Sequence, residues 1–237
     1  MKRALKWVGL AVAVIVLALG AGWYSAFGRN MPIVDGQQLV PGVVTVKDGF
    51  VSAFILDAGP GKVALVDAGK DTSGKAILEA LGKRGLTPAA VVAIFLTHWH
   101  PDHTAAAKLF PDAKVYMMEA DVPLLDDGTK VTHPLKDGEV VDVGDLHVET
   151  FATPGHTAGS AVYFARGVLF FGDSARGSKD GTMMPAVRLM SKDSGQNLAS
   201  LKTLAAKLRP RAAEVKVLAF AHSGPLQGFE PLAAFAR

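Results

Sequence analysis

Cysteine is absent from the 237-residue sequence. The chain therefore has no cysteine nucleophile and no disulfide bond. A strong excess of one charge is also lacking, since 25 Lys and Arg residues stand against 22 Asp and Glu residues, for a formal net charge of +3. Because no run of basic residues occurs either, we expect no nucleic-acid partner. What the sequence does contain is a dense grouping of several of its seven histidines.

Residues 97–104 read Thr-His-Trp-His-Pro-Asp-His-Thr and place His98, His100, Asp102 and His103 within six positions. Imidazole and carboxylate groups are the side chains that bind borderline divalent metals. A single histidine is more often a surface residue or a core residue with its hydrogen bonds satisfied. A structural core, however, has little reason to place three histidines so close together. The grouping therefore predicts a metal site.

The sequence around this grouping predicts a strand that ends in a ligand loop. Residues 91–96 form a continuous apolar run with β-branched and aromatic members, which is typical of a buried strand. Residues 104–110 favour a helix that Pro111 ends. The ligands are thus expected on a strand-to-helix loop at the carboxyl edge of a sheet, where open sheets commonly keep their sites. Pro101 should stiffen that loop.

Three later strand-like runs are each followed by a residue that can bind a metal. These residues are His156, Asp173 and His222. Four strands would then deliver metal-type ligands at their carboxyl ends. The two remaining histidines, His133 and His147, do not follow a strand end in this way, and we expect structural roles for them.

Together these residues resemble the metallo-β-lactamase fold superfamily of metallohydrolases. The resemblance covers about residues 33–225 and rests on the order His-x-His-x-Asp-His, His, Asp and His along the chain. The apolar run before Asp67 also resembles an early strand of the family, whose Asp braces the site without being a ligand. The implied fold is α/β (α+β), a four-layer αββα sandwich, formed here by a single catalytic domain of residues 31–237. Strand runs followed by helices in both halves of the sequence agree with this fold.

The resemblance implies a site for two divalent metal ions, with zinc as the default and Mn or Fe as alternatives. The implied ligands are His98, His100 and His156 for one ion, Asp102, His103 and His222 for the other, and Asp173 as a bridge between them. Two ions about 3.5–4 Å apart can share a hydroxide, because bound metal lowers the pKa of water from about 15.7 towards about 7. Asp102 is the candidate catalytic residue, which would orient that hydroxide.

The implied reaction is hydrolysis of an ester, thioester, lactone or lactam bond in a small-molecule substrate. The ligand set resembles that of glyoxalase II, but only fifteen residues follow His222, in place of a glutathione-binding domain. The absence of cysteine excludes the β-lactamase classes that need a Cys ligand. A mononuclear iron oxidoreductase similar to the persulfide dioxygenases and a phosphodiesterase are the alternatives. Residues 175–196 are the candidate specificity loop, because loops differ most between relatives on one fold.

Residues 1–30 predict a membrane anchor or a signal peptide. Three basic residues precede an uncharged run from Trp7 to Tyr24, a pattern typical of a membrane-spanning helix or a secretory signal. Basic residues before the run predict that the amino terminus stays inside. We therefore expect a protein of the inner (cytoplasmic) membrane, with its catalytic domain on the periplasmic or extracytoplasmic side. The alternative is a secreted or periplasmic protein after signal cleavage.

Overall fold

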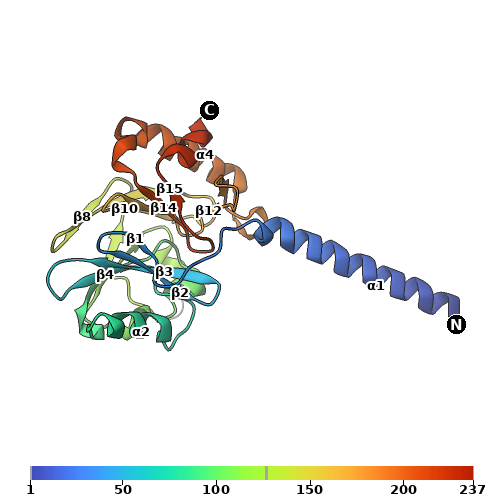
Figure 1. Ribbon diagram of the computed structural model, residues 1–237, viewed down its shortest axis with the longest axis horizontal. Coiled ribbons are helices and arrows are strands. Elements are labelled where there is room, and N and C mark those ends of the chain that lie inside the picture. Colours follow the sequence, from blue (N-terminus) through green and yellow to red (C-terminus); the bar gives the residue numbers. More distant parts are fainter. Residues whose placement is uncertain (1, 126–127, 237) are drawn as a thin grey trace. The chain divides into compact units, whose positions relative to one another are not determined.

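The computed structural model describes residues 2–125 and 128–236. The chain forms two compact units, Met1–Asn30 and Met31–Arg237. Figure 1 shows the elements of both units. All seven residues expected to bind metal belong to the second unit.

The first unit consists of the α-helix α1 (Lys2–Trp23), followed by the π-helical segment η1 (Tyr24–Gly28). A membrane-spanning helix needs about 20 consecutive apolar residues. Over residues 2–125 and 128–236, no helix combines the length and the apolar character that a membrane span requires.

This finding overturns the prediction of a membrane anchor in residues 1–30, and with it the predicted location in the inner membrane. The basic residues on which the predicted orientation depended lie outside the described side chains; they are Lys2, Arg3 and Lys6. The alternative interpretation of this segment as a signal peptide stays a prediction.

Two β-sheets make up most of the second unit. The first has seven strands, hydrogen-bonded to one another in sequence order. These strands are β1 (Gln38–Val40), β2 (Val43–Asp48), β3 (Val51–Asp57), β4 (Val63–Val66), β5 (Val91–Phe95), β6 (Lys114–Met118) and β7 (His133–Leu135). Strands β1 to β4 pair antiparallel, whereas β4 to β7 run parallel.

The second sheet has six strands in the order β15-β14-β11-β10-β9-β8. Its strands are β8 (Val140–Val143), β9 (Leu146–Ala152), β10 (Ala161–Ala165), β11 (Val168–Phe170), β14 (Val217–Ala219) and β15 (Leu226–Gln227). All neighbours pair antiparallel except β11 and β14, which are parallel. Strands β12 (Ala175–Gly177) and β13 (Met183–Pro185), which lie between β11 and β14 in the sequence, form a small separate sheet.

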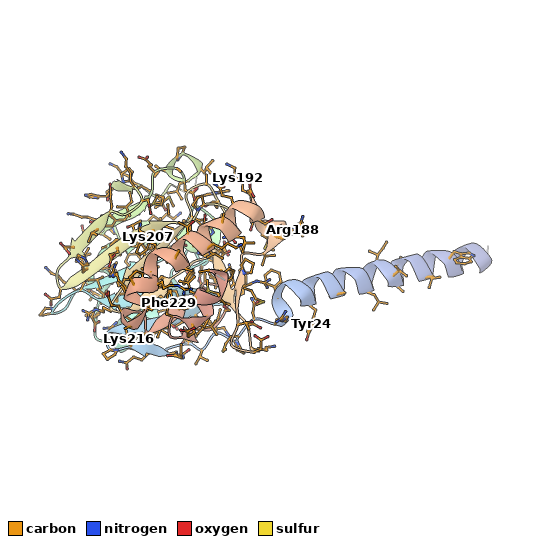
Figure 2. All side chains as sticks on the ribbon, turned by 90° about the horizontal axis from the view of Figure 1, so that it is seen from above. Tyr24, Arg188, Lys192, Lys207, Lys216 and Phe229 are labelled. Atoms are coloured by element: carbon orange, nitrogen blue, oxygen red, sulfur yellow. The ribbon has the colours of Figure 1, made fainter. Side chains whose placement is uncertain are left out.

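Helices cover the outer face of each large sheet (Figure 1). The longer helices of the second unit are α2 (Lys75–Lys83) and α4 (Ser194–Leu208). Figure 2 looks onto α4, with Lys207 near its carboxyl end; Phe229, also labelled, comes later in the chain, after β14 and β15. The short helical segments are α3 (Pro101–Thr104), α5 (Glu230–Ala233), η2 (Pro88–Ala90), η3 (Ala107–Leu109), η4 (Val122–Leu124), η5 (Arg188–Met190), η6 (Arg209–Glu214) and η7 (Ala234–Ala236).

The alternation of side chains along the strands explains the layers. In β3, Phe54 and Leu56 belong to the apolar core between the two sheets, whereas Ala53 and Ile55 belong to the core that includes α2. A strand directs successive side chains to opposite faces, so an apolar residue at every position buries both faces of the sheet. A third core lies between the second sheet and α4. The predicted four-layer αββα sandwich is confirmed.

The helix predicted over residues 104–110 is placed differently. The structure has α3 at Pro101–Thr104, followed after two residues by the 3₁₀ turn η3. Proline is favoured at the first position of a helix, because its fixed φ suits the helix and its missing N–H is not needed there. Asp102 and His103 therefore lie in a helical turn rather than on a loop.

Phe170 offers a test of the core between the sheets. Its side chain is fully buried, and its ring lies 5.1 Å from that of Phe54 on the other sheet. We expect Phe170→Ala to lower the free energy of unfolding by about 3–5 kcal/mol, because the cavity loses contacts from both sheets. Urea unfolding of the variant measures this, with Val140→Ala at an exposed strand position as the control. Equal effects of the two changes would contradict the assignment of Phe170 to the core.

Candidate active site

The structure brings all seven predicted residues together. His98 and His100 follow β5, and Asp102 and His103 lie in α3 directly after them. His156, Asp173 and His222 follow β9, β11 and β14 of the second sheet. The site therefore forms where strand ends of both sheets meet, as the sequence pattern indicates.

Three imidazole nitrogens form a first group, which we call the three-histidine cluster: His98, His100 and His156. His98 Nε2 lies 2.9 Å from His100 Nδ1, and His156 Nε2 lies 3.1 Å from the same atom. Nitrogens bound to one tetrahedral zinc at about 2.0–2.1 Å are separated by roughly 3.3 Å. The three nitrogens therefore converge closely enough to share one ion.

A second group, the Asp-His-His cluster, consists of Asp102, His103 and His222. Asp102 Oδ2 lies 3.2 Å from His222 Nε2 and 3.8 Å from His103 Nε2. The three differ in exposure: the His103 side chain is fully buried, whereas that of Asp102 is 27% exposed. Asp102 is thus the member of this cluster that solvent reaches most easily.

Asp173 lies between the two clusters and turns one carboxylate oxygen towards each. Its Oδ1 is 3.2 Å from His222 Nε2 and 3.4 Å from His103 Nε2. Its Oδ2 is 3.6 Å from His156 Nε2. The preceding residue, Gly172, has φ of 51°, and a Cβ there would collide with the Thr97 side chain. Glycine at this position therefore lets the Asp173 turn approach the ligand loop of the other sheet.

Buried partners fix which nitrogen of His98 and of His103 faces its cluster. Thr97 Oγ1 donates to Asp67 Oδ2 at 2.9 Å, so it can only accept from His98 Nδ1–H at 3.1 Å. His98 Nε2 then carries a lone pair towards the three-histidine cluster. In the same way, His103 Nδ1 donates to Asp67 Oδ2 at 2.8 Å and directs Nε2 into the Asp-His-His cluster. The predicted bracing position of Asp67 agrees with these contacts.

His222 is oriented by the backbone of the first sheet. Its Nδ1 donates to the carbonyl oxygen of Phe50 at 3.1 Å, and the Phe50 ring is stacked on the imidazole with centroids 5.7 Å apart. Nε2 of His222 therefore points at the two carboxylates. Phe50 lies between β2 and β3, so the hairpin of the first sheet positions a ligand candidate from the second.

The three-histidine cluster is neutral at neutral pH. Burial lowers the pKa of His156 to about 4, and burial also lowers the pKa of His98 and of His100. Neutral imidazole is the form that binds a metal ion. These three side chains therefore need to lose no proton when an ion binds.

The Asp-His-His cluster is charged in the absence of an ion. Burial opposes the charge of His222, but the carboxylates of Asp173 and Asp102 outweigh burial and raise the pKa of His222 to about 10. Burial likewise opposes the charge of His103, yet Asp67 and Asp173 raise its pKa well above the ordinary value. These two imidazolium ions in turn outweigh burial at Asp173 and hold the pKa of its carboxyl well below the usual range. Protons thus occupy the positions where a cation would bind.

The donor set fits a pair of divalent ions. His103 Nε2 and Asp173 Oδ1 are buried, and neither makes a hydrogen bond with a described residue, although ion pairs of 3.4 and 3.2 Å link Asp173 Oδ1 to His103 and His222. A buried polar atom without a hydrogen bond is costly unless an ion or water satisfies it. Both atoms face one another at 3.4 Å inside the site. Neutral imidazole and carboxylate ligands without sulfur suit Zn, Mn or Fe.

The remaining histidines do not join the site. His133 Nδ1 contacts Thr132 Oγ1 at 2.8 Å, and the exposed side chains of His147 on β9 and Asp142 on β8 pair at 2.7 Å. The segment 175–196 has a mixed character. Met183 is buried in the core beneath α4, whereas the Leu189 side chain is 93% exposed.

Two buried residues near the site are missing from the sequence prediction. Asp121 accepts hydrogen bonds from both ligand-bearing loops, through Trp99 N–H and Gly159 N–H. Asn197 donates to the carbonyl oxygen of Ser174, directly after Asp173, at 2.9 Å. Asp121 follows β6 by three residues, so a carboxylate soon after a strand end was the pattern that could have identified it.

Comparisons with known proteins agree with this fold and site. The family model described as the metallo-beta-lactamase superfamily matches residues 46–222. The chain belongs to the metallo-β-lactamase superfamily, whose members are mostly metal-dependent hydrolases. The resemblance predicted from the sequence is confirmed.

Curated relatives include a hydroxyacylglutathione hydrolase of Salmonella arizonae, 35% identical over 125 residues. That alignment covers 51% of this chain and 45% of the relative, so the chain matches less than half the length of that enzyme. Among solved structures, a metallo-beta-lactamase family protein from Thermus thermophilus is 27% identical, with a TM-score of 0.64 over 83% of this chain and 78% of that one. A subclass B3 metallo-beta-lactamase of Bradyrhizobium japonicum shares the fold at 23% identity, with a TM-score of 0.59 over 82% and 79% of the two chains.

The two clusters should differ in the pH dependence of metal binding. His103 and His222 have raised pKa values in the metal-free protein, so each must lose a proton to an incoming ion. We expect affinity at the Asp-His-His cluster to fall by up to about 100-fold per pH unit as pH decreases from 8 to 6, tenfold for each proton. Affinity at the three-histidine cluster should change little over this range. Zinc titration by calorimetry, in buffers of different ionisation enthalpy, measures the affinity of each cluster and the number of protons that binding releases. Two bound ions whose affinities depend equally on pH would contradict the charged and neutral states assigned to the two clusters.

Proposed function

We propose that this protein is a binuclear metal-dependent hydrolase that cleaves an ester, thioester, lactone or lactam bond of a small molecule. The observation that carries the proposal is the position of Asp173. One of its oxygens faces the Asp-His-His cluster and the other faces the three-histidine cluster. A carboxylate that serves two clusters is what a bridging ligand requires.

Two bound divalent ions, zinc by default, would supply a hydroxide nucleophile at neutral pH and polarise the substrate carbonyl. The protein's own contribution is to hold the ligand atoms in place before the substrate arrives. Asp67 and Thr97 fix the ring nitrogens of His98 and His103, so the site does not need to rearrange during the reaction.

Asp102 is the residue that we propose as catalytic. The hydrogen bond from His222 outweighs burial and lowers the pKa of Asp102, so its carboxylate is ionised at neutral pH. Its side chain is 27% exposed, more than any other side chain of the Asp-His-His cluster. An ionised, accessible carboxylate can accept a proton from the nucleophile and orient it towards the substrate.

The names of the relatives support the choice of the first substrates to test. Three of the curated relatives are named hydroxyacylglutathione hydrolase, and several structural neighbours are named metallo-beta-lactamases. A thioester and a β-lactam are therefore the first compounds to test, followed by esters and lactones. The exposed part of the 175–196 segment, Arg188–Met190, is the region that we propose to affect substrate choice, because loops set specificity on a shared fold.

Asp173→Ala tests the proposal directly. We expect hydrolysis to fall at least about 100-fold, because losing a ligand of both ions removes several kcal/mol of transition-state stabilisation. The zinc content should fall from two ions per chain to one or none, as measured by elemental analysis. Asp142→Ala, at an exposed carboxylate on β8, is the matched control and should retain both ions and activity.

The same preparations distinguish the alternative activities. A wild-type protein that is fully active with one iron per chain, and an Asp173→Ala variant with unchanged activity, would refute the hydrolase and favour the oxidoreductase. A panel of thioesters, β-lactams, lactones and phosphodiesters identifies the bond. Cleavage of phosphodiesters alone would assign the phosphodiesterase reaction instead.

A further inference from the structure

Asp121 is a fully buried carboxylate close to the three-histidine cluster. It lies beyond the carboxyl end of β6, directly before the short helix η4. Its Oδ1 accepts a hydrogen bond from Gly159 N–H at 2.6 Å. Its Oδ2 accepts from Thr157 Oγ1–H at 2.6 Å and from Trp99 N–H at 3.3 Å. A buried carboxylate is tolerated when donors of this number and kind surround it.

The three donors belong to two loops that carry ligand candidates. Trp99 lies between His98 and His100 on the loop after β5 of the first sheet. Thr157 directly follows His156 on the loop after β9 of the second sheet. One carboxylate therefore ties together the two loops whose imidazoles must meet. In the structure, His156 Nε2 and His100 Nδ1 lie 3.1 Å apart.

Close packing leaves this connection little freedom to adjust. A Cβ on Gly159 would lie 2.6–2.7 Å from the backbone nitrogen, Cβ and Cγ of Asp121, so glycine alone fits there. Ser160 Oγ accepts from Thr157 N–H at 2.9 Å and lies 2.8 Å from Thr157 Oγ1. The turn at residues 157–160 is thus held rigidly against the carboxylate, and a shift of Asp121 would move the segment that carries His156.

We propose that Asp121 is a positioning residue for the three-histidine cluster. It sets the distance between His100 and His156 across the two sheets, and it does so without contacting the ion itself. Asp67 differs from Asp121 in that it bonds to a candidate ligand itself: it contacts His103 directly and His98 through Thr97. This inference rests on the proposed function, since it assigns Asp121 a role towards an ion that the three histidines would bind.

The chemistry of the contacts explains why a carboxylate is needed. All three partners donate a proton to Asp121, and an ionised carboxylate only accepts. The amide of an asparagine would place an NH₂ group against one of these N–H or O–H donors. Asp121→Asn therefore keeps the volume of the side chain and removes at least one of the connections between the loops.

The experiment compares Asp121→Asn with a matched pair at the partner residue. Thr157→Val removes the hydroxyl that bonds to Asp121, and Thr157→Ser retains it. Zinc affinity is measured by competition with a chelator in two backgrounds. His222→Ala disables the Asp-His-His cluster and reports the three-histidine cluster, whereas His100→Ala does the reverse.

In the His222→Ala background we expect Asp121→Asn and Thr157→Val to weaken zinc binding by about 10–100-fold, the usual effect of removing a residue that orients a ligand. Thr157→Ser should bind as tightly as the background protein. In the His100→Ala background, none of the three changes should alter zinc affinity. Thermal unfolding of the metal-free variants is measured in parallel. The control for lost stability alone is Glu149→Gln, which weakens the ion pair between Glu149 on β9 and Arg211 in η6.

A purely structural role gives a different result. Lower thermal stability with unchanged zinc affinity in the His222→Ala background would overturn the inference, and so would an equal loss of affinity at both clusters. If Asp121→Asn fails to fold, the two Thr157 variants test the inference. Thr157→Val must then bind zinc more weakly than Thr157→Ser in the His222→Ala background, and equal affinities would overturn the inference. A wild-type protein that binds no zinc would refute the proposed function instead, which separates the two failures.

Discussion

Buried carboxylates paired with donors from different strands are the interaction on which the site depends. Asp67 bonds to the Thr97 loop and to His103, Asp121 connects loops from the two sheets, and Asp173 reaches both clusters. Each carboxylate would be costly to bury alone, so each keeps its place only while its donors keep theirs. The loops at the strand ends are consequently fixed by polar contacts, and the sandwich core beneath them supplies the apolar stability.

Electrostatics divides the site into two unlike halves. The three-histidine cluster is kept neutral by burial, whereas the Asp-His-His cluster contains two cations that balance nearby carboxylates. A bound cation would replace those protons and leave the charge around Asp173 nearly balanced. The metal-free protein can therefore fold without an uncompensated buried carboxylate at the centre of the site. Protons on the histidines in the metal-free protein, and a bound cation in the metal-loaded protein, both balance the negative charge of the buried carboxylates.

Much of the fold and of the candidate site follows from local sequence patterns. Apolar runs marked the central strands, and ligand-type residues at their carboxyl ends marked the site, because both depend on near neighbours in the chain. The helix at residues 104–110 was misplaced, since alanine-rich composition suggested a helix whereas Pro101 started one earlier. Asp121 was not recognised because its partners lie up to 38 residues away, and only the meeting of the two sheets reveals them. The predicted membrane anchor was also wrong, because an uncharged run alone does not define a spanning helix.

All seven candidate ligands are imidazoles or carboxylates, a choice that has a consequence for chemical durability. Thiolates bind zinc tightly, but peroxides convert them to sulfenic and sulfinic acids and disulfide exchange removes them from the metal. This centre contains no group that undergoes those reactions. Its competence to bind metal is therefore independent of the thiol-disulfide balance around it, and sulfur oxidation by peroxides falls on methionines such as the half-exposed Met190, which is not among the candidate ligands.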